Sequence, residues 1–324
     1  MKIRTILSLG IATIAIALIS LWMGQQSYTW FPPQASAESI LVDNLFSFLV
    51  TLGTFIFLGV VGTLTYSVLF QQVGKYDYSD GPHIEGNVTL EIVWTAIPFA
   101  LVIWIAAYSY QIYDQMSILG PMEHAHHGHI MAAANAAEPM EDHPMVANIN
   151  DSKNDSKSKA VENIQVLARQ WAWEFHYSDG TSGDVTSTEL HLPNNRRIKL
   201  ILHSEDVLHG LFIPAFRVKQ DVIPGRDIDF EFTPIREGKY RLRDSQYSGT
   251  YFASMQTDVV VESPEAYQKW LTSAAAQIPT AAYNPAFEEY ADLQKTNSDS
   301  WKTVVPAAPP VVNYSNSNSQ TSAL

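Results

Sequence analysis

Residues 164–176 read Ile-Gln-Val-Leu-Ala-Arg-Gln-Trp-Ala-Trp-Glu-Phe-His, and they decide the fold of the second half of the chain. The first part is rich in aliphatic residues, and from Trp171 to His176 large aromatic side chains alternate with other residues. Alternation with a period of two is typical of a strand with one buried face. The stretch therefore predicts two short strands, 164–167 and 171–176, with Trp171, Trp173 and Phe175 in a core.

Further short strands follow, and turn residues separate them. Pro193-Asn194-Asn195, Pro224-Gly225 and Glu237-Gly238 are typical turn sequences. The additional strands are expected at 197–203, 228–232, 239–243 and 257–262. Six or more short strands in one region predict a β-sandwich or a β-barrel.

A helix and a tail are expected after the last strand. Ser263 is a capping residue and Pro264 suits the first helical position, which predicts a helix to about Ala275. Residues 161–277 are thus expected to form one domain. The remaining residues, 278–324, have Pro-rich and Ser/Asn-rich ends and predict a tail that is largely extended or disordered.

Two apolar runs precede this domain. Residues 44–72 and 92–113 contain no charged side chain. Each is longer than the roughly 20 residues that cross about 30 Å of hydrocarbon as a helix. We therefore expect residues 38–113 to form a transmembrane hairpin, with helices at about 44–71 and 91–113.

The N-terminal residues 1–37 allow two interpretations. An apolar run from Ile6 to Met23 follows Lys2 and Arg4, and Ala35-Ser36-Ala37 has the small-x-small pattern of signal peptidase sites. The length of the run favours a retained third helix, whereas the motif favours a cleaved signal peptide, which we prefer. In both cases Lys2 and Arg4 keep the N-terminus inside, so everything after Asp114 lies outside.

Residues 114–160 change the character of the chain. They have no apolar periodicity and predict a flexible linker. A metal-binding role is conceivable for its histidines and methionines, but without fixed geometry such a tract binds weakly, and a solvated spacer is preferred. The residues are His124, His126, His127, His129, His143, Met122, Met131, Met140 and Met145.

Four blocks, in order, resemble subunit II of the haem–copper terminal oxidases. They are Leu90–Pro98 (LEIVWTAIP), Gln170–Phe175 (QWAWEF), Ser204–His209 (SEDVLH) and Arg217–Arg226 (RVKQDVIPGR). The resemblance extends over roughly residues 41–268. It implies a membrane-anchored all-β fold, in which a two-helix transmembrane hairpin precedes a cupredoxin-like Greek-key β-barrel. It also implies a bacterial cytoplasmic or thylakoid membrane, with the C-terminal domain on the periplasmic or lumenal side.

One loop departs from the pattern of the family. Members that oxidise cytochrome c carry Cys-x-Glu-x-Cys-x-x-x-His-x-x-Met there and bind a dinuclear copper centre. Here the two thiolates, the glutamate and the histidine are replaced, and the whole chain has no cysteine. The replacing residues are Asp244, Gln246, Ser248 and Phe252, while Met255 and the upstream His209 remain.

The replacing residues are poor copper ligands. Bridging thiolates are soft donors, whereas Asp244 offers hard oxygens and Phe252 cannot ligate. A mononuclear site of His209, Asp244 and Met255 can be drawn, but it mixes hard and soft donors without a thiolate. We therefore expect no metal in this chain, and we expect His209 to pack or hydrogen-bond at the subunit interface.

Without the copper relay, the chain resembles the quinol-oxidase type, with the cyanobacterial alternative oxidases as one candidate group. Haems, copper and the quinol (plastoquinol, ubiquinol or menaquinol) are then expected in the partner subunit I, beside a subunit III and membrane lipid. Nucleic acid is not expected as a partner. Two alternatives remain: a cytochrome c oxidase subunit with an atypical copper site, and a membrane-anchored metal-binding module.

Two further residues have expected roles. Glu91 lies at the inner end of the second predicted helix, where an ionisable group is costly. The resemblance places it at the entrance of the lysine-associated proton path into subunit I; a plain interfacial carboxylate is the alternative. Trp171 resembles the tryptophan through which electrons of cytochrome c enter, but with no acceptor behind it we expect core packing.

Overall fold

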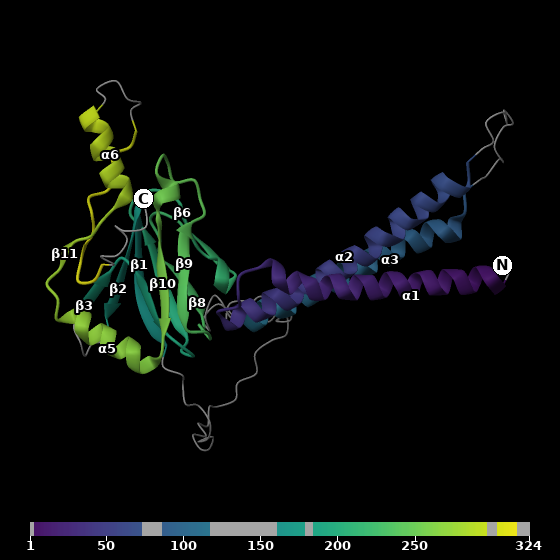
Figure 1. Cartoon of the computed structure of the whole chain (residues 1–324), viewed down its shortest axis with the longest axis horizontal. Coiled ribbons are helices and arrows are strands. Elements are labelled where there is room, and N and C mark those ends of the chain that lie inside the picture. The colour runs from purple at the N-terminus through teal and green to yellow at the C-terminus, as the bar shows by residue number, and fades with distance from the viewer. Residues whose placement is uncertain (1–2, 73–85, 117–160, 179–183, 297–302, 316–324) are drawn as a thin grey trace, which may run out of the picture. The chain divides into compact units, whose positions relative to one another are not determined.

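The computed structural model describes residues 3–72, 86–116, 161–178, 184–296 and 303–315 (Figure 1). The chain divides into two compact units. Met1–Pro32 and Ile40–Met116 form the helical unit, and Pro33–Ser39 and Ser117–Leu324 form the β unit. The short segment Pro33–Ser39 therefore belongs to the β unit although it precedes most of the helical residues.

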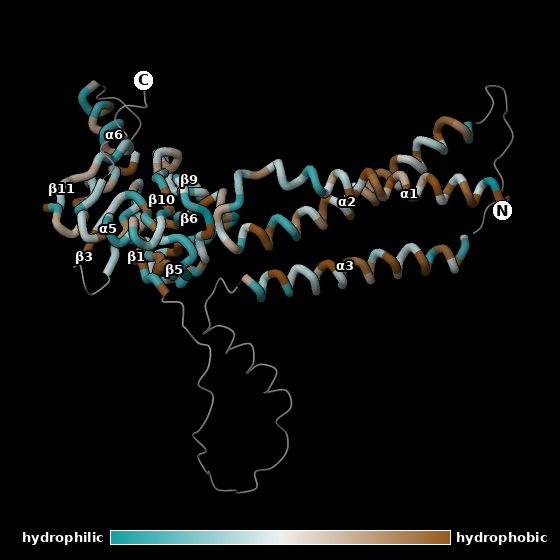
Figure 2. Tube along the Cα trace, turned by 60° about the horizontal axis from the view of Figure 1, so that its bottom comes forward, coloured by the Kyte–Doolittle hydropathy of each residue, from teal (hydrophilic) through white to brown (hydrophobic). Residues whose placement is uncertain are grey.

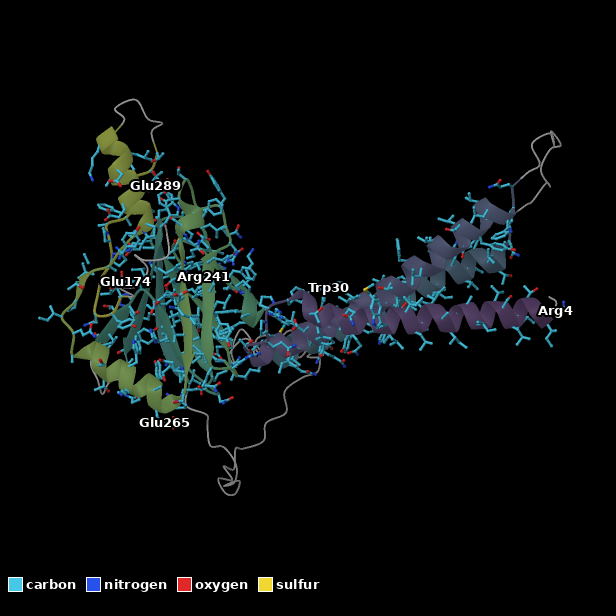
Figure 3. All side chains as sticks on the ribbon, in the orientation of Figure 1. Arg4, Trp30, Glu174, Arg241, Glu265 and Glu289 are labelled. Carbon is cyan, nitrogen blue, oxygen red and sulfur yellow. The ribbon has the colours of Figure 1, made fainter. Side chains whose placement is uncertain are left out.

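The helical unit contains α1 (Ile3–Gln26), a 3₁₀ turn η1 (Ser27–Trp30), α2 (Ala37–Phe70) and α3 (Val88–Met116). Arg4 lies near the N-terminal end of α1, and Trp30 lies beyond its other end (Figure 3). All three α-helices are long and apolar enough to cross a membrane (Figure 2). The prediction of a two-helix anchor was therefore wrong in its count, because Ile3–Trp30 is a third candidate span.

Both predicted hairpin helices exist, and both are longer than expected. The second candidate span begins at Ala37 instead of about residue 44, and the third begins at Val88 and continues to Met116. Polar residues at their ends, such as Glu38 and Asp114, are part of the helices. Charge-free runs mark the apolar middle of a membrane helix and miss the turns that extend into the interfaces.

The β unit is a sandwich of two five-stranded sheets. The first sheet has the order β3-β2-β1-β5-β8, and the second has the order β4-β10-β9-β6-β7. Most neighbours are antiparallel, but β1 pairs with β5 and β4 pairs with β10 in parallel. The strands are β1 (Glu162–Arg169), β2 (Ala172–Ser178), β3 (Asp184–Ser187), β4 (Leu190–Pro193), β5 (Ile198–Ser204), β6 (His209–Ile213), β7 (Val218–Val222), β8 (Ile228–Phe232), β9 (Gly238–Asp244) and β10 (Gln256–Glu262).

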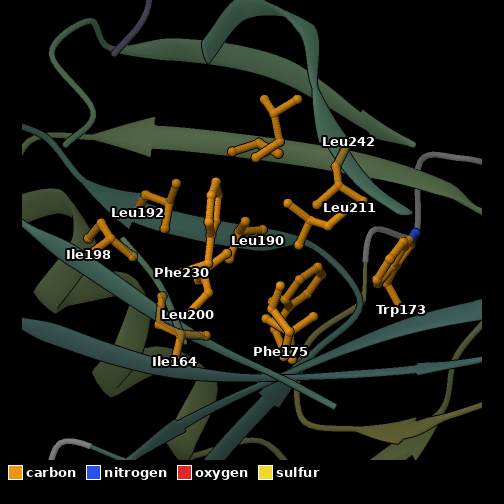
Figure 4. Close-up of a cluster of buried hydrophobic side chains, with 14 of the residues drawn as sticks. Ile164, Trp173, Phe175, Leu190, Leu192, Ile198, Leu200, Leu211, Phe230 and Leu242 are labelled. Atoms are coloured by element: carbon orange, nitrogen blue, oxygen red, sulfur yellow. The ribbon is translucent and has the colours of Figure 1, made fainter. Parts of the chain in front are cut away.

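The six predicted strands correspond to β1, β2, β5, β8, β9 and β10, which confirms the β-sandwich interpretation. The core lies between the two sheets, as Figure 4 shows for Ile164, Leu200 and Phe230 of one sheet and Leu211 and Leu242 of the other. Burial alternates strictly along β5, as the period of two requires. Burial of these side chains supplies most of the stabilisation of the fold.

Strand β2 differs from the expected alternation. Trp173 and Phe175 are buried, but Ala172 and Glu174 on the other face are buried as well. Glu174 is held there by ion pairs with Arg169 and His176. The second face of this strand is therefore covered, which a half-buried sheet pattern does not predict.

The helix α5 (Pro264–Ala275) is confirmed, and the Ser263 side chain accepts a hydrogen bond from the Ala266 N–H at its start. The prediction of a largely extended or disordered tail was wrong for residues 285–296, which are helical. Residues 278–296 and 303–315 contain α6 (Pro285–Thr296) and a small pair of strands, β11 (Thr280–Ala281) and β12 (Val311–Val312). The predicted His/Met linker lies, from residue 117 to 160, outside the described residues.

Candidate functional site

The candidate site forms where β6 begins and β9 ends. His209 is the first residue of β6, and Asp244 is the last residue of β9. The two strands are antiparallel neighbours, with Leu211 opposite Asp244. The Asp244 N–H donates to the Met255 carbonyl at 2.9 Å, which closes the loop 245–254. Residues that are 35 positions apart in the chain thus meet inside the sandwich.

His209 is fully buried and lies between two carboxylates. Its Nδ1 is 2.9 Å from Oδ2 of Asp244, and its Nε2 is 2.9 Å from Oδ1 of Asp206. No part of His209 is exposed to solvent. With carboxylate acceptors at both ring nitrogens, both nitrogens carry protons in the preferred state, and the ring is an imidazolium.

Asp244 is saturated with hydrogen-bond donors. Its Oδ1 accepts from the N–H groups of Gly210 and Gln246 at 2.8 and 2.9 Å. Its Oδ2 accepts from the Ser248 hydroxyl at 2.8 Å in addition to His209. The backbone must pass close by, because a Cβ on Gly210 would collide with Ser245 and Gln246.

In this cluster, the charged form of each group is stabilised by the opposite charge of its neighbour. Burial disfavours the charged ring, yet the hydrogen bonds and charges of Asp206 and Asp244 raise the pKa of His209 above its usual value. Burial likewise opposes ionisation of the two aspartates, but the hydrogen bond from His209 and the backbone donors lower the pKa of both. Each shift of a pKa thus favours the ionised form of its group, an imidazolium between two carboxylates.

Met255 and Trp173 complete the surroundings of the cluster. Met255 is 1 % exposed, and its carbonyl accepts both the Asp244 N–H and, at 3.3 Å, the Trp173 indole N–H. The Trp173 ring lies edge-on to His209 with centroids 6.2 Å apart. Met255 thus serves packing and backbone pairing, which explains its presence without a metal.

The remaining loop residues point to other partners. The Gln246 amide donates to Asp221 at 2.8 Å, and Phe252 packs edge-on against Tyr247 with centroids 5.2 Å apart.

Asp206 belongs to the block Ser204–His209, but its role was not predicted from the sequence. Its spacing of three residues from His209 was the available signal.

Trp171 lies over the same loop and is 1 % exposed. Its indole N–H donates to the Ser248 carbonyl at 3.2 Å, and its ring packs edge-on against Tyr251 with centroids 5.1 Å apart. Gly249 allows this approach, since a Cβ there would collide with the ring, and its φ of +119° suits glycine. Core packing, as expected from the sequence, is the observed role of this side chain.

The donors at this site do not fit a dinuclear copper centre. No thiolate is available, and Phe252 offers no donor atom. The nitrogens of His209 and the oxygens of Asp244 are already engaged with one another and with backbone N–H groups. Among the described residues, no group of three or more His, Cys, Asp or Glu side chains could hold a metal ion. In the drawn mononuclear site of His209, Asp244 and Met255, the side chains of His209 and Asp244 are likewise occupied by hydrogen bonds.

Glu91 lies in the helical unit, in the first turn of α3. Asn87 caps this turn, because its side chain accepts from the Leu90 N–H at 3.2 Å and its carbonyl accepts from the Glu91 N–H at 3.0 Å. The Glu91 side chain is exposed and borders a shallow hollow of about 420 Å³ whose other walls are Val88, Ile92, Thr95, Ala96 and Phe99. Among the described residues it is the one carboxylate in the wall of this hollow, which is apolar except for Thr95.

Comparison with known proteins agrees with this architecture. The transmembrane domain of cytochrome c oxidase subunit II matches residues 13–112, and its periplasmic domain matches residues 184–263. Cytochrome c oxidase subunit 2 of Synechocystis sp. is 35% identical over 276 residues, which is 82% of this chain and 82% of that protein. The chain belongs to the haem–copper oxidase subunit II family.

Other members are similar as well. Cytochrome c oxidase subunit 2 of Thermostichus vulcanus is 34% identical over 86% of this chain and 88% of that protein. The crystal structure of the periplasmic domain of subunit II of cytochrome oxidase of Bradyrhizobium japonicum is 26% identical, with a TM-score of 0.31 over 34% of this chain and 90% of that structure.

Family membership defines the setting of the site. This subunit II is an integral membrane protein whose C-terminal domain lies outside the cytoplasm. It is part of a respiratory terminal oxidase complex, with subunit I as a partner. The buried Asp206–His209–Asp244 cluster lies at the junction of β6, β9 and the loop 245–254 of this subunit.

Proposed function

We propose that this protein is subunit II of a haem–copper quinol:oxygen oxidoreductase and that it carries no copper centre of its own. The observation that carries the proposal is the Asp206–His209–Asp244 cluster. Hydrogen bonds at 2.9 Å occupy both nitrogens of the one histidine that remains from the copper pattern. An electron from a soluble cytochrome would find no acceptor in this domain.

The proposal assigns the redox chemistry to the partner. Haems, copper and the quinol belong to subunit I, and a lipid-soluble quinol delivers electrons from within the bilayer. The β domain then serves as a cap, which its tightly packed core suits. Plastoquinol, ubiquinol and menaquinol are all compatible substrates, and subunit III is a further expected partner.

The alternative is oxidation of cytochrome c, the activity in the names of the most similar relatives described above. It requires an electron acceptor at the loop 244–255, and the donor set there lacks both thiolates. Trp171, the remaining element of such an entry path, is buried. We therefore favour the quinol over the cytochrome.

Turnover of the purified complex tests the proposal. Oxygen consumption is measured with a soluble quinol analogue and, separately, with reduced cytochrome c, and copper is counted in the same sample. We expect turnover with the quinol alone, together with only the copper of subunit I. Turnover with cytochrome c, or copper bound by subunit II, would overturn the proposal and support the alternative.

We further propose that Glu91 admits protons to subunit I from the inner side of the membrane. An exposed carboxylate on a surface that is otherwise apolar needs either water or a polar partner there. In the described part of the chain, the one further polar side chain that lines the adjoining hollow is Thr95, whose hydroxyl donates to the Glu91 carbonyl at 2.8 Å. Among the described residues that line the hollow, no other titratable side chain competes with the carboxylate for its proton.

Replacement of Glu91 by alanine is expected to slow oxygen reduction, by roughly the 10²–10⁴-fold that positioned proton transfer contributes at most. Assembly should remain normal, because the side chain is exposed. Asp114→Asn, at the other end of the same helix, is the matched control and should leave turnover unchanged. Normal turnover of the Glu91→Ala complex would show that the carboxylate is only an interfacial group.

A further inference from the structure

The segment Pro33–Ser39 is built into the β unit like an additional edge strand. Its backbone donates from Ala35 to the Ala215 carbonyl at 3.1 Å and from Ala37 to the Thr233 carbonyl at 2.9 Å. The Ala35 carbonyl accepts from the Ile235 N–H at 2.9 Å. Three backbone hydrogen bonds therefore tie the candidate cleavage motif Ala35-Ser36-Ala37 to the sandwich.

The side chains of this segment are buried in the same contact. Ala35 and Ser36 are fully buried, and the Ser36 hydroxyl donates to the Phe216 carbonyl at 3.0 Å. Glu38 is 3 % exposed, accepts from the Thr233 N–H at 3.1 Å and pairs with Arg197 at 2.8 Å. Loss of the residues up to Ala37 would uncover this edge and leave buried backbone groups without partners.

A second contact, inside the helical unit, joins α1 to α2. The Gly24 carbonyl accepts from the Ser47 hydroxyl at 2.8 Å and from the Ser27 hydroxyl at 2.7 Å. A Cβ on Gly24 would collide with the Thr51 hydroxyl, so the two helices approach closely at a glycine. Small residues and interhelical hydrogen bonds of this kind hold membrane helices together.

The connection between these helices is packed as well. The Tyr28 hydroxyl donates to the Asn44 side chain at 2.8 Å. Trp30 and Phe31 both lie edge-on to Phe46, with centroids 6.1 and 4.9 Å from it. These contacts involve polar and aromatic groups at specific positions, whereas a signal peptide requires only an apolar run and small residues at the cleavage site.

We propose that residues 1–37 remain in the mature subunit, with α1 as a third membrane helix and Ala35-Ser36-Ala37 as an edge of the sandwich. Two independent contacts carry this inference: the α1–α2 interface at Gly24 and the backbone pairing of residues 35–37. This proposal replaces the interpretation of residues 1–37 as a cleaved signal peptide. It is independent of whether a quinol or cytochrome c donates electrons to the complex.

The absence of cysteine allows a direct test by thiol labelling of the full subunit in its complex. Thr29→Cys places a thiol on the exposed surface of η1, outside the apolar run 6–23, and Gln268→Cys places a control thiol on the exposed surface of α5. After purification through a C-terminal tag, a membrane-permeant maleimide should label both variants to the same stoichiometry. Label on Gln268→Cys alone would mean that α1 has been removed, which overturns the proposal.

A mass comparison provides the second test and does not depend on labelling. Signal peptidase requires a small residue before the cleaved bond, so the substitution Ala37→Leu should block cleavage. Wild type and Ala37→Leu are purified from membranes, and their intact masses are measured. We expect both at the mass of a chain that includes residues 1–37, about 36.2 kDa for the whole sequence, apart from the substitution. A wild-type subunit that begins at Glu38, beside a larger Ala37→Leu subunit, would refute retention.

Discussion

His209 and His191 are both buried imidazoles that lie between two carboxylates, but they are held in different ways. At His209 both ring nitrogens make hydrogen bonds of 2.9 Å, to Asp206 and Asp244. At His191 the ring nitrogens are 3.3 Å from Glu262 and 3.6 Å from Glu189, and the second distance is too long for a hydrogen bond. The ring of the first histidine is held by two short hydrogen bonds, and that of the second by one longer hydrogen bond to Glu262.

At His191, contacts with aromatic rings hold the imidazole where the second hydrogen bond is absent. Its ring stacks on Trp270 with centroids 3.9 Å apart and planes 8° from parallel, and Tyr314 of the C-terminal segment lies edge-on at 5.2 Å. Burial opposes the charge, but Glu189 and Glu262 raise the pKa of His191, so a charged ring against Trp270 gains a cation–π contribution. A buried histidine among carboxylates is therefore compatible with two structural roles, neither of which needs a metal.

The largest expected effect comes from restoring the family pattern at the first of these sites. The combined substitutions Asp244→Cys, Gln246→Glu, Ser248→Cys and Phe252→His should turn His209 from a hydrogen-bonded cation into a copper ligand, because thiolates replace its aspartate partner. We expect two copper ions in subunit II of the variant and none in the wild type, measured by elemental analysis and near-infrared absorption. The same set with Ser248 retained lacks the second bridge and is the control; equal copper in the variant and the wild type would contradict this expectation.

Removal of Asp244 alone should destabilise the β unit strongly. Asp244→Ala leaves the buried His209 with one carboxylate and leaves the Gly210 and Gln246 N–H groups without their acceptor. Breaking such a buried pair costs about 3–5 kcal/mol of unfolding free energy. Denaturant unfolding of the purified subunit in detergent measures the loss. Asp244→Asn retains an acceptor oxygen and should lose less; equal stability of Asp244→Ala and wild type would show that the cluster contributes nothing.

The stability of the β unit should pass through a maximum at mildly acidic pH. The raised pKa of His209 means that its contribution is complete below its unfolded value near 6.5 and is lost as the pH rises through the folded value. The lowered pKa values of Asp206 and Asp244 mean that their contribution is present above about 3.8 and is lost as the pH falls through the folded values. Melting temperatures from pH 3 to 9 check this, and in His209→Gln the alkaline decline should be smaller. An unchanged alkaline decline in that variant would assign it to other groups.

The smallest effect is expected at the second histidine. Glu262→Gln removes a carboxylate that is 26% exposed and 3.3 Å from His191, so solvent and Trp270 limit the loss of unfolding free energy to about 1 kcal/mol or less. The exposed Asp292→Asn on α6 is the control and should not change the melting temperature. A loss at Glu262 as large as that at Asp244 would remove the distinction between the two sites.

The sequence predicted secondary structure correctly where the signal is a pattern of neighbouring residues. The alternation in 164–176 and the charge-free runs predicted the sandwich and two of the membrane helices, and Ser263-Pro264 predicted the start of α5. Strands β3, β4, β6 and β7 were missed because they have only four or five residues each and lack a clear period of two. The ordered part of the tail was missed because its partners, such as Thr186 for Asn313, are far away in the chain.

The sequence by itself determined what this subunit lacks, since the absence of cysteine and of a ligand at Phe252 follows from residue identity. Only the tertiary structure decided which contacts His209 makes in this subunit. The pairing of β6 with β9 brings Asp244 to His209, and the loop 204–209 brings Asp206 to the other side of the ring. The same holds for Ala35-Ser36-Ala37, a short motif whose meaning depends on the backbone groups of residues 215, 233 and 235 that it meets. Hydrogen-bond partners distant in sequence are set by folding, and local patterns do not encode them.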